Sequence, residues 1–133
     1  MVLTIHTDGG SRGNPGIAGI GIVIKEGNYV VGEIAESIGM QTNNFAEYTA
    51  VIRALEWLIE KKLTHEPVHF KLDSLLVVQQ INGAWKVKEP TLKPLVARVH
   101  TLLESFTEVT FLHIPRELNF EADTLANRAM DQG

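Results

Sequence analysis

The sequence has no cysteine among its 133 residues. Disulfide bonds and thiolate metal sites are therefore excluded, and any metal ion must be bound by oxygen atoms or by the five histidines. Long apolar runs are also absent, since none approaches the roughly 20 residues needed to cross a bilayer. The first eight residues lack the basic and apolar regions of a secretion signal. We therefore expect a soluble protein with no membrane partner, and the lack of cysteine fits a cytoplasmic location.

A surplus of basic residues is absent as well. The chain has 16 Asp and Glu against 12 Lys and Arg, which gives a formal net charge of −4. A protein that holds phosphate groups by charge alone needs a broad basic surface. The charge balance therefore argues against that mode of binding, unless some of the acids hold divalent cations that supply positive charge locally.

The N-terminal part of the chain predicts strands. At 133 residues and 44% hydrophobic, the chain suits one core, so we expect a single domain over residues 1–133. Alternating apolar residues lead up to Asp8, where a strand ends before a cluster of turn-forming residues. Gly27-Asn28 is typical of a hairpin turn. The predicted strands, residues 1–8, 17–25 and 29–38, form an antiparallel meander.

From Asn44 the apolar spacing changes to that of a helix, and Glu47 three residues later resembles an N-terminal capping pair with Asn44. The remaining pattern predicts helices over about 44–62, 74–82 and 94–106, strands over 68–72 and 109–114, and a closing helix from about Asn119. Helical crossovers make successive strands run parallel. The sequence therefore predicts an α/β fold, with a five-stranded mixed sheet whose last two strands run parallel to the first, flanked by helices.

Four acids fall at the ends of these predicted elements. Asp8 and Asp73 end two strands, at the sheet edge where ligands of open α/β sheets gather. Neighbouring strands lie about 4.8 Å apart, so the two carboxylates would repel each other unless a cation lay between them. Glu47 and Asp123 lie in the first turns of helices, and short connections place them at the same edge. We therefore expect all four carboxylates to converge.

Convergent carboxylates predict a site for Mg²⁺ or Mn²⁺, which are hard cations that prefer oxygen ligands. Two ions about 3.5–4 Å apart hydrolyse phosphodiesters, because one activates water and the other stabilises the leaving 3′ oxygen. With four acids bound to metal, the other twelve balance the twelve Lys and Arg. Each acid alone has a simpler interpretation, as a turn former, a helix cap or a solvated acid. Their joint occurrence favours the metal site.

Four blocks of sequence point to a known family. They are Thr7-Asp8-Gly9-Gly10-Ser11-Arg12-Gly13-Asn14-Pro15-Gly16, Thr42-Asn43-Asn44-Phe45-Ala46-Glu47-Tyr48, Asp73-Ser74, and Arg116-Glu117-Leu118-Asn119-Phe120-Glu121-Ala122-Asp123. With these blocks the chain resembles the type 1 ribonuclease H family over nearly its whole length. The resemblance implies metal-dependent hydrolysis of the RNA strand of an RNA–DNA hybrid, leaving 5′-phosphate and 3′-hydroxyl ends. It also implies that Asp8, Glu47, Asp73 and Asp123 are the metal ligands.

The resemblance further implies a surface for the hybrid. The glycine-rich segment matches the part of the family whose backbone approaches the RNA strand and reads its 2′-hydroxyl groups, and glycine permits such close approach. The residues implied in hybrid contacts are Gly9, Gly10, Ser11, Arg12, Gly13, Asn14, Thr42, Asn43, Gln79 and Trp85. Of these, Thr42 and Asn43 match positions that hold a DNA phosphate. Taken alone, Asn14 fits turn chemistry, Gln79 an exposed helix position, and Trp85 packing between helices.

The family also has a flexible basic residue near the last strand, and two residues fit this position. Arg116 opens the Arg-Glu-x-Asn part of the last block, and His113 ends the last predicted strand. A histidine would transfer protons near neutral pH, whereas an arginine keeps its proton and acts through its charge. We favour Arg116, with His113 as the alternative.

The chain departs from the family pattern in two places. Many members insert a basic helix and loop after the tryptophan that Trp85 matches, but here the chain passes almost directly to Pro90. We therefore expect weaker hybrid binding than in relatives that have this insertion. Leu75 stands where many relatives have a polar residue that contacts the substrate.

Three other functions fit part of the pattern. A hybrid-binding module of the same fold without catalysis would be favoured by loss of a carboxylate. A nuclease acting on DNA would have no use for a loop that reads 2′-hydroxyl groups. A phosphate-ester enzyme would use residues 9–16 as a phosphate cradle, but the segment lacks the Gly-Lys-Ser/Thr ending of a P-loop. We expect an endoribonuclease that binds RNA–DNA hybrid together with two metal ions and acts as a monomer with no obligate protein partner.

Overall fold

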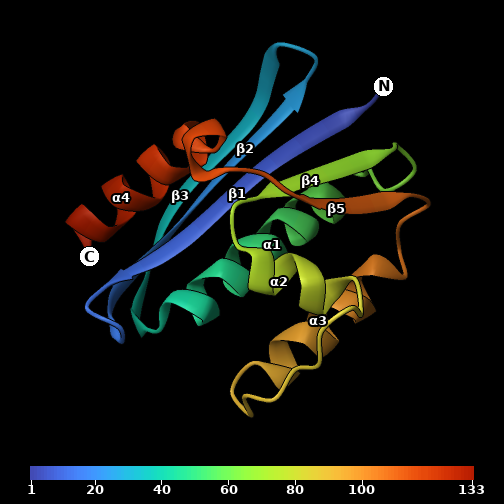
Figure 1. The fold of residues 1–133 in the computed structure, drawn as a ribbon. Coiled ribbons are helices and arrows are strands. Elements are labelled where there is room, and N and C mark those ends of the chain that lie inside the picture. Colours follow the sequence, from blue (N-terminus) through green and yellow to red (C-terminus); the bar gives the residue numbers. More distant parts are fainter.

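A computed structural model describes residues 1–133. The elements are β1 (Leu3–Arg12), β2 (Gly16–Glu26), β3 (Tyr29–Gln41), α1 (Asn43–Glu60), β4 (Val68–Leu72), α2 (Leu75–Ile81), α3 (Lys93–Leu103), β5 (Val109–His113), a short 3-10 helix (Arg116–Leu118) and α4 (Phe120–Gln132). All five strands join one sheet in the order β3-β2-β1-β4-β5 (Figure 1). The predicted order of strands and helices is confirmed.

β1 lies at the centre of the sheet and joins its two halves. It pairs antiparallel with β2, which pairs antiparallel with β3, so the predicted meander is confirmed. On its other side β1 pairs parallel with β4, which pairs parallel with β5. The last pair of the β1–β4 ladder is Thr7 with Leu72. The residue that follows on each strand is therefore at the same edge of the sheet.

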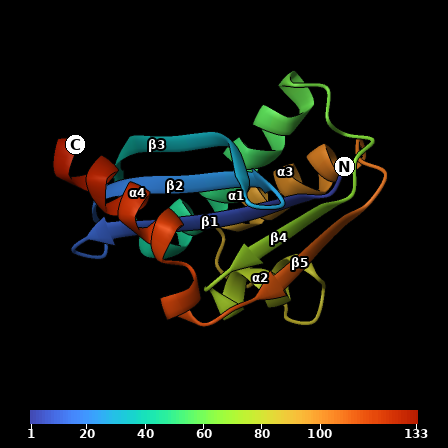
Figure 2. The ribbon, with the colours of Figure 1, turned by 90° about the horizontal axis from the view of Figure 1, so that it is seen from above.

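Helices cover both faces of the sheet. α1 and α3 lie on one face and α4 lies on the other, above β2 and β1 (Figure 2). The core between α1 and the sheet is apolar, and Ile5, Ile22, Leu55 and Phe70 are all fully buried there. Burying a side chain of this size stabilises the fold by about 1.5–3 kcal/mol. This core holds β1 and β4 in register beneath the site described below.

The structure corrects two boundaries predicted near the glycine-rich segment. β1 does not end at Asp8 but continues to Arg12, pairing Gly10 with Gly19 of β2. The turn follows only at residues 13–15, where Gly13 has a φ of +85°. Glycines predict turns by their freedom at positive φ, but here Gly9 and Gly10 lie in a strand, and at Gly9 the backbone of α1 leaves no room for a side chain. Likewise β3 continues to Gln41, three residues beyond the predicted end.

The predicted cap of the first long helix is wrong. Thr42, not Asn44, caps α1, and its hydroxyl accepts a hydrogen bond from the backbone N–H of Phe45. Glu47 does not fold back to the helix start, because its carboxylate is bonded to β1 instead.

The helices of this fold are too short or too polar to qualify as membrane spans.

Candidate active site

Two acids lie at the carboxyl end of the β1–β4 pair. Asp8 follows Thr7, the last residue of β1 that pairs with β4, and Asp73 is the first residue after β4. β1 and β4 are neighbours in the sheet. Asp8 is 8% exposed, so its carboxyl group is almost withdrawn from water. The strand register thus brings together two acids that are 65 positions apart in the sequence, as their residue numbers show.

Glu47 reaches this edge from α1. Its carboxylate accepts a hydrogen bond of 2.5 Å from the backbone N–H of Gly9, the residue after Asp8. A Cβ atom on Gly9 would collide with the backbone of Ala46 and would lie 2.6 Å from the backbone nitrogen of Glu47. Helix and strand therefore touch backbone to backbone, and only glycine at position 9 permits this contact. The glycine-rich segment sets the position of Glu47.

Asp8, Glu47 and Asp73 form a compact cluster. One carboxylate oxygen from each lies within 4.8 Å of the other two. Burial, followed by the charge of Asp73, raises the pKa of Asp8 to about 8. Burial and then the charge of Asp8 raise the pKa of Glu47 well above its usual value. Three carboxyl groups this close require either protons or a cation between them, and oxygen ligands without thiolate or imidazole suit Mg²⁺ or Mn²⁺.

Asp123 lies in the same pocket but outside this cluster. It projects from the first turn of α4, and its negative charge contributes to the raised pKa of Asp8. Its carboxylate is 3.7 Å from Arg116, which is 80% exposed. Three of the four predicted ligands therefore lie within reach of one ion, and the fourth lines the pocket that contains them.

The pocket around the carboxylates is polar and lined by the glycine-rich strand. Its lining residues are Asp8, Gly9, Gly10, Ser11, Arg12, Asn43, Asn44, Glu47, Asp73, Ser74, Arg116, Asp123, Asn127 and Met130. Five of the ten residues predicted to contact a nucleic acid line this pocket, namely Gly9, Gly10, Ser11, Arg12 and Asn43. Arg12 is held by a salt bridge of 2.7 Å to Asp131. Its charge is partly neutralised, which leaves Arg116 as the more available cation at the rim.

Hydrogen bonds tie the β1–β2 turn to the start of α1. The side-chain oxygen of Asn43 accepts from the backbone N–H of Ser11 at 2.8 Å, and that of Asn14 accepts from the backbone N–H of Asn43 at 3.0 Å. Both amide oxygens are therefore occupied, and the amide N–H groups face no protein acceptor and can donate to a ligand. Asn14 and Thr42 line a second shallow pocket next to the first.

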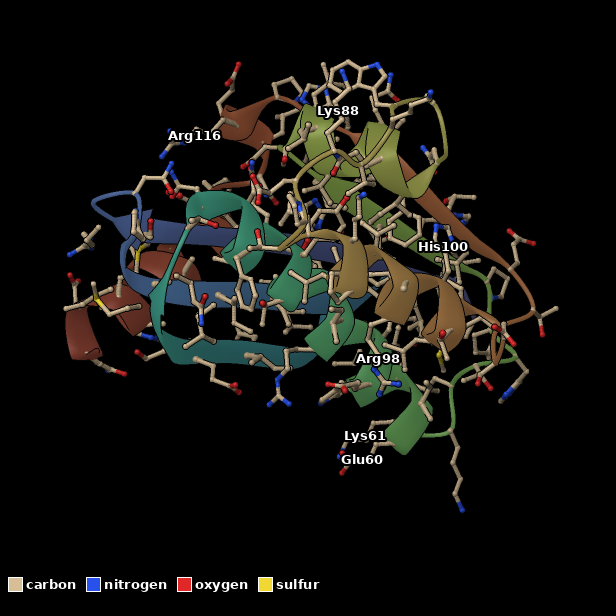
Figure 3. All side chains as sticks on the ribbon, turned by 90° about the horizontal axis from the view of Figure 1, so that it is seen from below. Glu60, Lys61, Lys88, Arg98, His100 and Arg116 are labelled. Carbon is tan, nitrogen blue, oxygen red and sulfur yellow. The ribbon has the colours of Figure 1, made fainter.

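Gly13 lies in the turn after β1 and lines neither pocket, and neither do Gln79, Trp85 and His113. Gln79 is on α2, and its backbone carbonyl accepts from the backbone N–H groups of Ala84 and Trp85. Trp85 is 44% exposed, so it is not a core residue, and its contact with hybrid stays a prediction beside packing at the boundary between helices. His113 ends β5 with an exposed side chain and does not line the pocket, whereas Arg116 does. Figure 3 shows Arg116 on the opposite side of the molecule from Lys61 and Arg98.

Sequence reasoning gave no role to Asn119, although it belongs to the last of the four blocks. Its side chain is buried, with 1% exposed, and its amide nitrogen donates to the carbonyl oxygen of Thr7 and to Asp73. The sequence feature that could have pointed to Asn119 is the Arg-Glu-x-Asn spacing ahead of Asp123. An asparagine at the start of a helix is commonly an N-cap, and the sequence carries no sign of a contact with a residue 46 positions away.

Comparison with curated proteins finds two informative relatives. Ribonuclease HI of Halobacterium salinarum is 42% identical over 127 residues, covering 95% of this chain and 63% of that protein. A bifunctional protein of Mycobacterium tuberculosis is 42% identical over 133 residues, covering 98% of this chain and 36% of that protein. The chain therefore spans less than two thirds of the length of either relative.

The fold is shared with solved ribonuclease H structures. LC11 ribonuclease H1, crystallised in complex with an RNA/DNA hybrid, superposes with a TM-score of 0.93 at 46% identity, covering 98% of this chain and 97% of that one. The family model described as reverse transcriptase-like matches residues 6–129. Here α2 and α3 are joined without the intervening basic helix. The chain therefore belongs to the type 1 ribonuclease H family, in its short form.

Proposed function

We propose that this protein is a metal-dependent endoribonuclease that hydrolyses the RNA strand of RNA–DNA hybrids. The observation that carries the proposal is the cluster of Asp8, Glu47 and Asp73, whose oxygens lie within 4.8 Å of one another in a polar pocket. Ribonuclease HI of Halobacterium and the hybrid-bound LC11 enzyme support the choice of substrate. Cleavage leaves a 5′-phosphate and a 3′-hydroxyl.

The carboxylates would hold Mg²⁺ or Mn²⁺, with Asp8, Glu47 and Asp73 as ligands and Asp123 completing the set once a substrate phosphate enters. When bound, a pair of such ions supplies an activated water molecule and stabilises the leaving 3′ oxygen. The protein's own part is to keep the carboxylates together against their mutual repulsion. The Gly9 contact with Glu47 and the register of β1 with β4 provide this arrangement.

Selection of RNA falls to the segment that lines the pocket from Gly9 to Arg12. Its glycines allow a sugar-phosphate chain to come close to the backbone, and the 2′-hydroxyl distinguishes RNA from DNA. Asn14 and Asn43 supply amide donors beside this path, since their oxygens are already bonded to protein. Thr42 lies in the adjoining pocket, in a position suited to a phosphate of the DNA strand.

One observation favours a second candidate function, a hybrid-binding module without catalysis. Asp123 lies outside the three-carboxylate cluster, and its carboxylate is near Arg116. If Asp123 never joined the other three carboxylates around the metal ions, the protein would bind hybrid without cutting it. The two functions differ in a single measurable property, which is cleavage in the presence of divalent cations.

The test compares three labelled duplexes: an RNA–DNA hybrid, duplex DNA and duplex RNA, each with Mg²⁺, with Mn²⁺ and with a chelator. We expect cleavage of the RNA strand of the hybrid only, dependent on the cation, with 5′-phosphate ends. The matched control is Asp73→Asn, which should bind hybrid without cutting it. Binding without cleavage by the wild-type protein under every condition would assign the non-catalytic function, and cleavage of duplex DNA would overturn the substrate.

A further inference from the structure

Asn119 connects three of the elements that carry the carboxylates. Its side-chain nitrogen donates to the carbonyl oxygen of Thr7 at 2.9 Å and to Oδ2 of Asp73 at 3.1 Å. Thr7 immediately precedes Asp8 on β1, and Asp73 immediately follows β4. The backbone carbonyl of Asn119 also accepts from the backbone N–H of Asp123 on α4. A single residue thus links the strand of Asp8, Asp73 itself and the helix of Asp123.

The chemistry of the two contacts requires an amide. Both neighbours of Asn119 are acceptors, so the side chain must turn its NH₂ group toward them, and only an NH₂ group has two hydrogens to give. The hydroxyl of serine has one hydrogen and lies one bond closer to the backbone, so it cannot bridge the two acceptors. Alanine has no donor, and an ionised aspartate would repel Asp73. Since the side chain is 1% exposed, no water replaces these bonds freely.

Two further features show that Asn119 is not placed for the stability of its own helix. It occupies the N-cap position of α4, where asparagine normally accepts a hydrogen bond from the first turn, but its side chain makes no such bond. Its Oδ1 atom is buried and has no hydrogen-bond partner. A residue selected only to start a helix would satisfy both groups. The side chain of Asn119 therefore bonds to Asp73 and does not cap α4.

We propose that Asn119 is a positioning residue for the metal site, which fixes the orientation of the Asp73 carboxylate through its bond to Oδ2. This inference deepens the proposed function and rests on the carboxylate cluster being a metal site. Hydrogen bonds that orient a metal ligand typically change metal affinity by about 10- to 100-fold when they are removed. The expected consequence is weaker binding of the cation rather than loss of the fold.

The experiment compares Asn119→Ala and Asn119→Ser with the matched control Asn82→Ala. Asn82 also donates its side-chain amide to a backbone carbonyl, that of Phe111, but it contacts no carboxylate. Mn²⁺ alone is titrated into each metal-free protein by calorimetry, and thermal unfolding is recorded without metal. Asn119→Ser keeps a good N-cap residue, so it reports on Asp73 even where Asn119→Ala folds poorly.

We expect both Asn119 variants to bind Mn²⁺ at least about tenfold more weakly than wild type, and Asn82→Ala to bind it unchanged. Loss of thermal stability without metal should not distinguish Asn119→Ser from Asn82→Ala. Unchanged Mn²⁺ affinity in Asn119→Ser would overturn the positioning role. A wild-type protein that binds Mn²⁺ but fails to cleave hybrid would overturn the proposed function and leave the Asn119 result intact, so the two failures can be told apart.

Discussion

The two halves of β1 bury very different side chains. In the first half Leu3 and Ile5 are fully buried against α1 and the neighbouring strands. In the second half Asp8 is 8% exposed and lies against two other carboxyl groups. Apolar burial stabilises the fold, whereas burial of a carboxyl group among others opposes its ionisation, as the raised pKa of Asp8 shows. The apolar half of the strand therefore stabilises the fold. This stability offsets the cost of burying the carboxyl groups together in the other half.

The largest effect should come from removing the buried charge in the second half. Asp8→Asn keeps the shape of the side chain but removes a carboxylate from the cluster. We expect cleavage of hybrid to fall by a factor on the order of 10³, the scale seen when a group that acts electrostatically at a reacting centre is lost. Steady-state cleavage with saturating Mg²⁺ measures it. Turnover within a few-fold of wild type would remove Asp8 from the metal site.

Asp8→Asn should also raise the free energy of unfolding of the metal-free protein, and the size of this increase should depend on pH. The pKa of Asp8 is about 8 in the folded protein and about 3.9 when unfolded, so between these values the folded state binds more protons. The free energy of unfolding of the wild type therefore decreases as pH rises through this window. Asparagine does not titrate, so Asp8→Asn should unfold more than about 5 °C higher than wild type at pH 8, with the difference vanishing near pH 4. Thermal unfolding in chelator at several pH values measures this difference.

A smaller effect should follow from adding one methyl group to the strand where it meets α1. A Cβ atom on Gly9 would collide with the backbone of Ala46, whereas one on Gly10 would lie 3.5 Å from the side chain of Met130, an ordinary contact. We expect Gly9→Ala to lose about 1–3 kcal/mol of unfolding free energy, and Gly10→Ala to lose much less. Urea unfolding without metal measures both.

The pair Gly9→Ala and Gly10→Ala also tests how Glu47 is placed. The collision at position 9 moves the backbone of Glu47, so Mn²⁺ should bind more weakly to Gly9→Ala than to Gly10→Ala. Equal Mn²⁺ affinities would mean that the contact between β1 and α1 serves stability alone.

The sequence predicts the apolar half of β1 better than the polar half. Apolar alternation marks Leu3 and Ile5 as core because any residue buried on one face of a sheet must follow that period. The order of the strands and helices follows from the same periodicities, and it is confirmed. The four acids could be chosen because each lies at a predicted element end, where parallel strands and helix N-termini meet.

What the sequence could not predict depends on contacts between distant segments. Gly9 and Gly10 have the local preferences of a turn, yet they lie in β1 because α1 and α4 pack against that stretch. Glu47 fits a capping pair by its spacing, but the backbone N–H of Gly9 binds it instead. Asn119 fits a helix cap, and its bond to Asp73 spans 46 positions. Local propensity depends only on the neighbouring sequence, so it cannot identify the distant residue that each of these residues contacts.

The smallest expected effect concerns the cation at the rim of the polar half. Arg116 lies 3.7 Å from Asp123 and lines the pocket, and His113 does not line it. A charge at this distance in a partly exposed site is worth about 1–4 kcal/mol, so Arg116→Ala should slow turnover by about tenfold while His113→Ala changes it by less than about twofold. Because arginine keeps its proton, its role is one of charge, and Arg116→Lys should retain most of the activity. Cleavage rates at saturating Mg²⁺ rank the three variants. A slower His113→Ala than Arg116→Ala would transfer the auxiliary role to the end of β5, and would mean that a proton donor, not a fixed charge, serves the buried carboxylates.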